Sequence, residues 1–471
     1  MKNLITCIFM FWVLLLYAQN KQVLYGLEEV PQSMMLNPGS IVNYDYHFGI
    51  PFLSHIHING GSSGISAYDI FKDSNDDIND RITNSIRGLK NTDFFTATEQ
   101  LEIISFGWKN NKDFYFSGGV YQELDFILYF PKDLATLAWE GNANYIGKDF
   151  DLGEISTTGE LLSIYHFGAN KKVTDKLTLG ARFKIYSSML SYRSTNNKGT
   201  FTTRLSETEN NIYEHIISNA DITVETSGIE SLEDLDGSSQ VVSEIMGRAF
   251  FGGNIGFGMD LGGTYEINEK WTASASLLDV GAIFYTKDVE TYQVKGEYVL
   301  DGIELLFPAL EDGESTNDYY DDLIDEIEDT FEVDTLNNSY TRFRPVKMNA
   351  SIKYNFGKAV GGSGACNCLK MGENQEFNQS VGFQYYSMFR PKGPQIAATL
   401  FYYRRFSDHF STKATYTIDS YSAANIGLGI VANMGVVNFY IMADNLQWYQ
   451  NIAKAKSVSL QLGFNIIIDK E

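Results

Sequence analysis

The chain alternates between apolar and polar residues over unusually long stretches. In "KLTLGARFKIYSSML", residues 176–190, Leu177 and Phe183 fall on one side of an extended strand, and Arg182 and Lys184 fall on the other. A period of two indicates a strand, because successive side chains point to opposite faces. Soluble strands usually run about five or six residues, whereas a tilted strand needs about nine to eleven to cross a bilayer. The length of the alternation therefore favours a membrane-spanning strand.

The same alternation recurs along the chain. Three clear runs are "KWTASASLLDVG" from Lys270, "RPVKMNASIKYNFG" from Arg344 and "KSVSLQLGFNIII" from Lys456. Looser runs begin near Tyr46, His55, Leu101, Phe114, Ser163, Gly253, Gln379, Gln395, Phe410, Ala424 and Val436. Together they predict roughly 14 spanning strands, an even number in the usual range for bacterial barrels. We expect an all-β fold, a transmembrane antiparallel β-barrel over residues 46–471, with no linker dividing it.

The polar faces of these strands predict the character of the barrel interior. Arg182, Lys184, Lys347 and Lys353 all belong to polar faces. In a barrel whose outer face is apolar, these four side chains point into the lumen. We therefore expect a charged lumen.

Composition agrees with a barrel. Charged residues make up 20% of the chain and aromatic residues 14%, with 29 Tyr and 32 Phe, which suits the aromatic girdles of a barrel at the membrane interfaces. After the first 18 residues, no segment reaches the 18 or more apolar residues of a spanning helix. The alternative is a soluble all-β protein such as a propeller or stacked sandwiches, but its strands should be shorter and its outer faces more charged.

The first residues predict export. Residues 1–18 have the form of a signal peptide, with Lys2 as the positive region, an apolar run from Leu4 to Leu16 and a cleavage site after Ala18. An N-terminal membrane anchor is the alternative, although the apolar run is short for a span. An exported barrel is expected in the outer membrane of a Gram-negative bacterium, where lipid surrounds it. The net charge of −23 argues against a nucleic-acid partner.

Residues 19–45 precede the first expected strand and have a character of their own. Pro31 and Pro38 restrict the backbone and remove two hydrogen-bond donors, while Met34 and Met35 form an apolar group beside Asn37. Such a segment either enters the lumen from the periplasmic end as a plug or caps the floor of the barrel.

Two strongly acidic segments lie between expected strands. They are "DSNDDINDR", residues 73–81, and the stretch 311–334, where the spacing of apolar residues suits a short amphipathic helix. Long barrel loops usually face outside, so Asp321, Asp322, Asp325 and Glu326 are candidate contacts for a partner. The first segment lacks the central Gly and terminal Glu of a calcium-binding loop, which favours a solvated loop.

The sequence carries weak signals for catalysis or metal binding. Ser62 in "GGSSG" matches the nucleophile motif in form only, because no convincing helix follows it. His55 and His57 share a strand face without a third ligand nearby, which favours polar lumen residues. Cys366 and Cys368 either form a small disulfide or stay free. We expect no enzymatic activity, no metal and no cofactor.

Short motifs resemble those of a known family. "VLYGLEEVPQSMMLNPGS", residues 23–40, is similar to the opening of PorP/SprF-like outer-membrane barrels of Bacteroidetes-type bacteria, with Asn37-Pro38-Gly39 carrying most of the match. "ASASLLDVGAI" from Ala273, "SYTRFRPVKMNASIKYNF" from Ser339 and "IMADNLQ" from Ile441 add to it. The resemblance implies an outer-membrane barrel associated with type IX secretion. A looser resemblance to fatty-acid-transporter-like barrels rests on architecture.

Three functions follow from these observations. The first is a structural or partner-binding barrel in type IX secretion or surface-protein assembly, with secretion-machinery or surface proteins as partners. It predicts a plugged lumen and a function that is carried by the loops. The second is a transporter of hydrophobic small molecules, which predicts an apolar lumen pocket and a lateral opening where Gly or Pro interrupts a strand. The third, an outer-membrane enzyme, has Ser62 as its only candidate nucleophile.

Overall fold

The computed structural model describes residues 21–206, 212–233, 235, 237–300, 333–357 and 377–469. The signal-peptide candidate, most of the second acidic segment with Asp321, Asp322, Asp325 and Glu326, and both Cys366 and Cys368 lie outside these residues.

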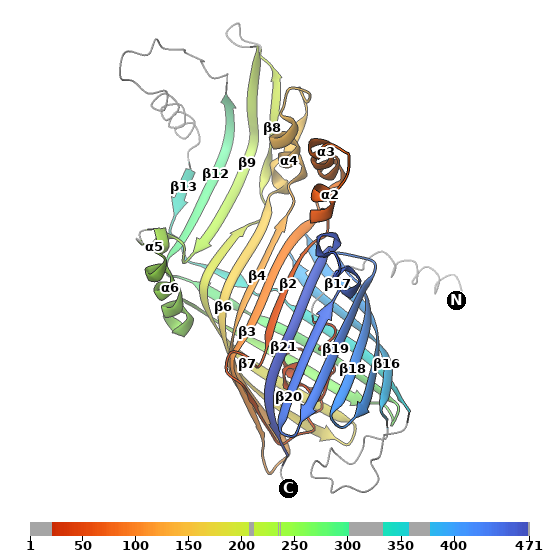
Figure 1. Ribbon diagram of the computed structural model, residues 1–471. Helices are drawn as coiled ribbons and strands as arrows, with labels where there is room; N and C mark the ends of the chain where they lie inside the picture. The colour runs from red at the N-terminus through yellow and green to blue at the C-terminus, as the bar shows by residue number, and fades with distance from the viewer. Residues whose placement is uncertain are drawn as a thin grey trace, which may run out of the picture.

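Most strands join into one closed antiparallel barrel (Figure 1). The barrel has 14 positions, because β1 and β2 share one position, between β21 and β3, and β14 and β15 share another, beside β11. The prediction of an all-β barrel with roughly 14 strands is therefore confirmed. The barrel strands are β1 Tyr46–Gly49, β2 Ile56–Ser62, β3 Phe94–Lys109, β4 Phe114–Tyr129, β6 Ser156–Thr174, β7 Leu177–Ser194, β10 Asn254–Glu266, β11 Trp271–Tyr285, β14 Tyr340–Phe343, β15 Lys347–Phe356, β16 Gln379–Arg390, β17 Gly393–Ser407, β18 Phe410–Ile418, β19 Asn425–Met434, β20 Val437–Asp444 and β21 Ser457–Ile468.

The wall is inverted relative to a soluble protein, with its apolar face outward. On β7, the Phe183 side chain is 51% exposed, while its neighbour Lys184 is 2% exposed. The outward row continues across neighbouring strands, where Phe183 stacks on Phe257 with ring centroids 6.1 Å apart. Alternation therefore places an apolar belt around the barrel and polar side chains in the lumen.

The two ends of the barrel differ. At one end, short turns join β3 to β4, β6 to β7 and β17 to β18. At the other end, long connections carry the helices α2 Ala67–Phe71, α3 Ile78–Gly88, α4 Lys132–Glu140, α5 Glu230–Glu233 and α6 Ser238–Gly247. None of the helices that the structure describes has both the length and the apolar character to span a membrane. The acidic segment 73–81 lies at the long-loop end, where Asp77 caps α3.

A second group of strands extends beyond the barrel at the long-loop end (Figure 1). It contains β5 Asp149–Asp151, β8 Lys198–Leu205, β9 Tyr213–Ser227, β12 Val289–Leu300 and β13 Val333–Leu336, paired in the order β5–β8–β9–β12–β13. The last residues of β9 also pair with β7, so this extension is continuous with the wall. The alternation along the chain predicted a barrel over residues 46–471 and did not distinguish these strands from it.

Candidate functional site

The segment 21–45 lies inside the barrel. It contains the short 3₁₀-helix η1, Pro31–Met35, all of whose residues are buried. Met34 packs with Tyr44 and Tyr115, and Met35 packs with aromatic and aliphatic side chains of the lumen. We call residues 21–45 the plug.

The Asn37-Pro38-Gly39 turn brings the plug against the wall. The Asn170 side chain on β6 donates hydrogen bonds to the carbonyl oxygens of Pro38 and Ser40, both at 2.7 Å. A Cβ atom on wall residue Gly180 would lie 2.0 Å from the Pro38 carbonyl oxygen, so only glycine permits this approach. The motif is thus a docking turn, and glycine in the facing strands is part of it.

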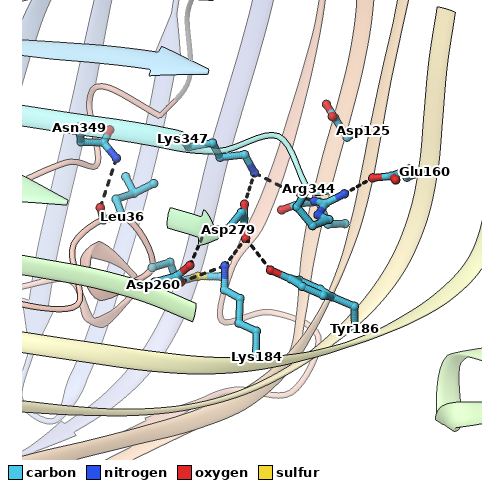
Figure 2. A network of polar contacts seen from close by, with 12 residues as sticks. Leu36, Asp125, Glu160, Lys184, Tyr186, Asp260, Asp279, Arg344, Lys347 and Asn349 are labelled. Carbon is cyan, nitrogen blue, oxygen red and sulfur yellow. Dashed lines mark hydrogen bonds and ion pairs between the residues drawn. The ribbon is translucent and has the colours of Figure 1, made fainter. Parts of the chain in front are cut away.

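Polar side chains of the barrel wall bind the plug at two further positions, one at Gln32 and one at Leu36. The Gln32 amide donates to Glu102 and to Asn465, both at 2.8 Å, and Asn465 donates back at 2.9 Å. Nearer the docking turn, the Leu36 carbonyl oxygen accepts from Ser276 at 2.5 Å and from Asn349 at 3.4 Å; the Asn349 bond is drawn in Figure 2. The plug is therefore held by hydrogen bonds with barrel strands on several sides.

Two ionisable residues of the plug, Lys21 and Glu29, are buried where their charged forms lose hydration. Burial lowers the pKa of Lys21 to about 7, and its Nζ atom lies 3.3 Å from Nε2 of His55. Burial also raises the pKa of Glu29, although the hydroxyls of Tyr403 and Ser411 donate to its carboxylate. Both groups pay a desolvation cost that they would recover in water.

A network of ion pairs crosses the lumen beside the plug (Figure 2). Asp279 on β11 lies 2.5 Å from the Lys184 ammonium and 2.8 Å from that of Lys347. Asp260 on β10 lies 2.9 Å from Lys184 and 2.5 Å from Arg182. All of these groups except Lys347, whose side chain is 12% exposed, are almost completely buried, and their opposite charges compensate one another.

The network continues toward the long-loop end. Arg344 pairs with Glu123 at 2.7 Å and with Glu160, and Arg390 forms a two-pronged pair with Asp125 at 2.6 and 2.7 Å. A buried apolar cluster of Phe94, Ile127, Tyr129 and Tyr421 lies toward this end. The plug, the ion pairs and this cluster thus all occupy the lumen.

Among the described residues, cavities remain in the lumen, and two of them lie beside the plug. One has a volume of about 60 Å³ and is lined by Leu36 together with charged residues such as Glu123, Lys347 and Arg390. The other has a volume of about 160 Å³ and includes Asn37 in its lining. The plug separates them, since consecutive plug residues face different cavities. The smaller one has room for on the order of four water molecules.

The residues singled out from the sequence fall into three groups. Arg182, Lys184 and Lys347 meet in the ion-pair network, whereas Lys353 lies apart and pairs with Glu28 of the plug at 2.8 Å. Pro31, Met34, Met35, Asn37 and Pro38 all lie in the plug. The four acidic residues proposed for a partner loop lie outside the described residues.

The weaker candidates have plain structural positions. Ser62 ends β2, and its hydroxyl accepts a hydrogen bond from the Ile65 amide at 3.3 Å. The helix that follows, α2, is only five residues long. His55 and His57 are buried, with Nδ1 of His55 2.6 Å from the Tyr440 hydroxyl. Within the described part of the chain, no group of three or more His, Cys, Asp or Glu residues could hold a metal ion.

Sequence reasoning missed most acidic partners. Asp260 and Asp279 were not assigned to the site, although each interrupts an apolar or small-residue run and could have been noticed there. Glu123 and Glu160 lie in strands whose alternation is less regular. Their role depends on pairing between distant segments, which no local pattern carries.

Comparisons place these features among known proteins. The model of a protein family described as a family of unknown function (DUF5723) matches residues 38–444. No curated protein matches the chain in sequence. Among solved structures, a Pseudomonas aeruginosa FadL homologue is similar at 10% identity and a TM-score of 0.42, covering 96% of this chain and 99% of that one. The Ralstonia pickettii toluene transporter TbuX is similar at 12% identity and a TM-score of 0.40, covering 93% and 94%.

Proposed function

The chain belongs to the family of unknown function DUF5723, and we propose that it transports hydrophobic small molecules across the outer membrane of a Gram-negative bacterium. The observation that carries this proposal is an interruption in the regular strand pairing of the barrel wall, next to the plug. Closed antiparallel walls normally keep every strand paired along its length.

The interruption lies between β1 and β2. Gly49 pairs with Asn465 and Ile56 pairs with Leu462, so residues 50–55 stand opposite residues 463–464 only. Backbone hydrogen bonds still join this bulge to both neighbouring strands, from the Ile50 amide to Phe464 at 3.1 Å and from the Phe52 amide to Ile103 at 3.1 Å. Pro51 within it has no amide hydrogen to donate to a neighbouring strand. The extra residues bulge outward, with the Phe52 side chain 56% exposed on the outer surface.

This interruption meets the plug on its inner side. Ser54 and His55 are fully buried, and His55 contacts Lys21 of the plug. A shift of the plug would therefore remove contacts from the interrupted part of the wall. In this proposal, the plug and residues 50–55 of the wall close the barrel together.

The charges in the lumen favour a route through the wall, and not along the barrel axis, for an apolar molecule. Along the barrel axis, such a molecule would meet the ion pairs around Asp279 and would separate buried charges from their partners. Breaking buried pairs of this kind costs several kcal/mol. A path through the wall beside the apolar Phe52 side chain would avoid them.

Deletion of residues 51–54 tests the proposal. It leaves Ile50 and His55 opposite residues 464 and 463, so β1 and β2 become one continuous strand against β21. We expect cells that produce the full chain to take up the hydrophobic fluorophore N-phenylnaphthylamine faster than cells without it. The deletion should abolish this gain while the barrel still inserts in the outer membrane.

A control variant separates the effect of the extra residues from that of their particular side chains. The double substitution Phe52→Leu and Leu53→Phe keeps the extra residues and their apolar character, and it should retain the uptake. Equal uptake by the full chain and the deletion variant would contradict the proposal, as would uptake no faster than in cells lacking the protein.

A second function is favoured by the extension. The sheet of β5, β8, β9, β12 and β13 projects beyond the barrel and offers a surface to other proteins (Figure 1). Together with the resemblance of residues 23–40 to PorP/SprF-like barrels, it supports a partner-binding role in type IX secretion or surface-protein assembly. Mass spectrometry of proteins that co-purify from outer membranes tests it. Secretion or surface proteins that are lost when β8 and β9 are deleted would support this role.

A further inference from the structure

Helix α6 and the turn that follows it, residues 238–252, lie outside the barrel wall beside β6 and β7 (Figure 1). We call this segment the outer foot. None of the residues of α6 itself is buried. Val241 and Ile245 are half-buried, which places them on the side of the helix nearer the protein.

The outer foot carries an apolar stripe that no part of the described protein covers. Val242 is 59% exposed, Met246 is 48% exposed and Phe250 is 68% exposed. Residues four apart lie on one face of a helix, so Val242 and Met246 are neighbours, and Phe250 follows in the turn. A stripe of three large apolar side chains at this spacing is costly to leave in water.

The position of the stripe is fixed by a buried arginine. Arg248 is 6% exposed, and it donates to the Gly228 carbonyl oxygen at 2.5 Å and to the Met189 carbonyl oxygen at 3.1 Å. The Ser187 hydroxyl on β7 donates to the Arg248 carbonyl oxygen at 2.7 Å. The outer foot is thus fastened to the wall at its C-terminal end.

The stripe is continuous with the apolar belt of the barrel. The Phe251 ring stacks on the outward-facing Tyr165 of β6, with ring centroids 4.3 Å apart. Phe167, the next outward residue of β6, is exposed, and Phe183 on the adjacent strand continues the belt. The surface that would contact lipid on the barrel therefore extends without a break onto the outer foot.

The charges of the segment agree with an interfacial position. Glu244, on the opposite side of α6 from Val242, pairs with Arg248 at 3.2 Å, and Gln240 on that side is exposed. Amphipathic helices with one polar and one apolar face lie at the boundary between headgroups and acyl chains.

We propose that the outer foot is a membrane-binding element whose apolar stripe inserts among the acyl chains of the lipid around the barrel. The inference goes beyond transport or partner binding, and it requires only that the barrel spans a membrane. The outer foot then holds the long-loop end of the barrel at a fixed depth, where α6 enters the interface beside β7.

Spin labels measure the depth of the outer foot directly. In the chain carrying Cys7→Ser, Cys366→Ser and Cys368→Ser, single cysteines are introduced by Val242→Cys, Phe250→Cys or Gln240→Cys and labelled with a nitroxide. The protein is reconstituted in phosphatidylcholine vesicles. The accessibility of each label to oxygen, which concentrates in lipid, is compared with its accessibility to water-soluble nickel ethylenediaminediacetate. A fourth label at Phe183→Cys on the belt reports whether the barrel itself is inserted.

We expect the labels at 242 and 250 to resemble the belt label, with high oxygen and low nickel accessibility, and the label at 240 to be accessible to nickel. A belt label in lipid with labels at 242 and 250 as open to nickel as that at 240 would overturn the inference. Labels at 242 and 250 shielded from both reagents would also overturn it, since protein would then cover the stripe. A failure of the barrel to insert is recognised separately by the belt label.

Discussion

Asp279 is the acidic centre of the lumen, because it compensates Lys184 and Lys347 at once. Its backbone adopts a left-handed conformation, with φ of 60°, and its amide donates to the Asp260 carboxylate at 2.7 Å. The local geometry of β10 and β11, whose pairing shifts register between Met259 and Leu261, therefore brings the two carboxylates together.

Replacing this carboxylate should destabilise the barrel. Asp279→Asn leaves two buried lysines without their main partner, and a loss of about 3–5 kcal/mol is expected for breaking a buried pair. The measurement is the temperature at which the folded barrel loses its faster migration in SDS gels. Glu266→Gln is the matched control, since Glu266 pairs with Lys172 at 3.4 Å in solvent and should cost at most about 1 kcal/mol. Equal losses in the two variants would contradict this.

The lowered pKa of Lys21 predicts that docking of the plug depends on pH. Its pKa is about 7 in the docked plug and 10.5 in water, so between these values release of the plug takes up a proton. Lowering the pH from 10.5 to 7 should therefore weaken docking by up to about tenfold per pH unit, with no further effect of this group below pH 7.

Bilayer conductance at pH 7 to 10 measures this effect. Openings of the full chain should become more frequent as the pH falls, and the Lys21→Met variant should show a flatter dependence. A dependence that is equally steep in both proteins would rule out Lys21 as its source.

At the scale of elements, the alternation of apolar and polar residues was sufficient to predict a strand wherever that strand has lipid on one side and the lumen on the other. β7, β11, β15 and β21 have one apolar outer face, so their side-chain pattern reports both existence and orientation. Looser runs gave the right strands with displaced starts. β3 begins at Phe94 and not near Leu101, because the residues before Leu101 alternate less clearly.

The extension could not be found in this way. β9 is largely half-exposed on both faces, and β12 places Glu290, Gln293 and Lys295 among its apolar residues. Strands with water on both sides lack an apolar face, so their sequences resemble loops. The turn Asn37-Pro38-Gly39 was visible in the sequence, but its docking position was not, since its contact with Gly180 joins residues far apart in the chain.

Phe150 is expected to hold the extension together. It is fully buried between Tyr145, at 5.6 Å between ring centroids, and Phe201, at 6.4 Å. Phe150→Ala should cost the extension about 3–5 kcal/mol of local stability, because it leaves a cavity. Limited proteolysis should then cleave within β8 and β9 while the barrel stays intact. Phe71→Ala, at an exposed ring, serves as the control, and equal cleavage in both variants would refute this role.

At the scale of the whole molecule, the parts form a closed barrel with an apolar belt, a plugged and charged lumen, and a projecting sheet at one end. A barrel of this form has two stable positions for its plug only if the lumen side chains can exchange plug contacts for water. The hydrogen bonds at Gln32, Leu36 and Asn170 are all of a kind that water can replace.

The most direct measurement compares single-channel conductance of the full chain with that of a variant lacking residues 30–40 in planar lipid bilayers. This deletion removes η1 and the docking turn but leaves every barrel strand. We predict a full chain that is closed for most of the recording and a deletion variant with sustained, larger conductance steps. If both proteins fold as barrels and conduct equally, the segment is not a plug, and closure of this barrel must lie elsewhere.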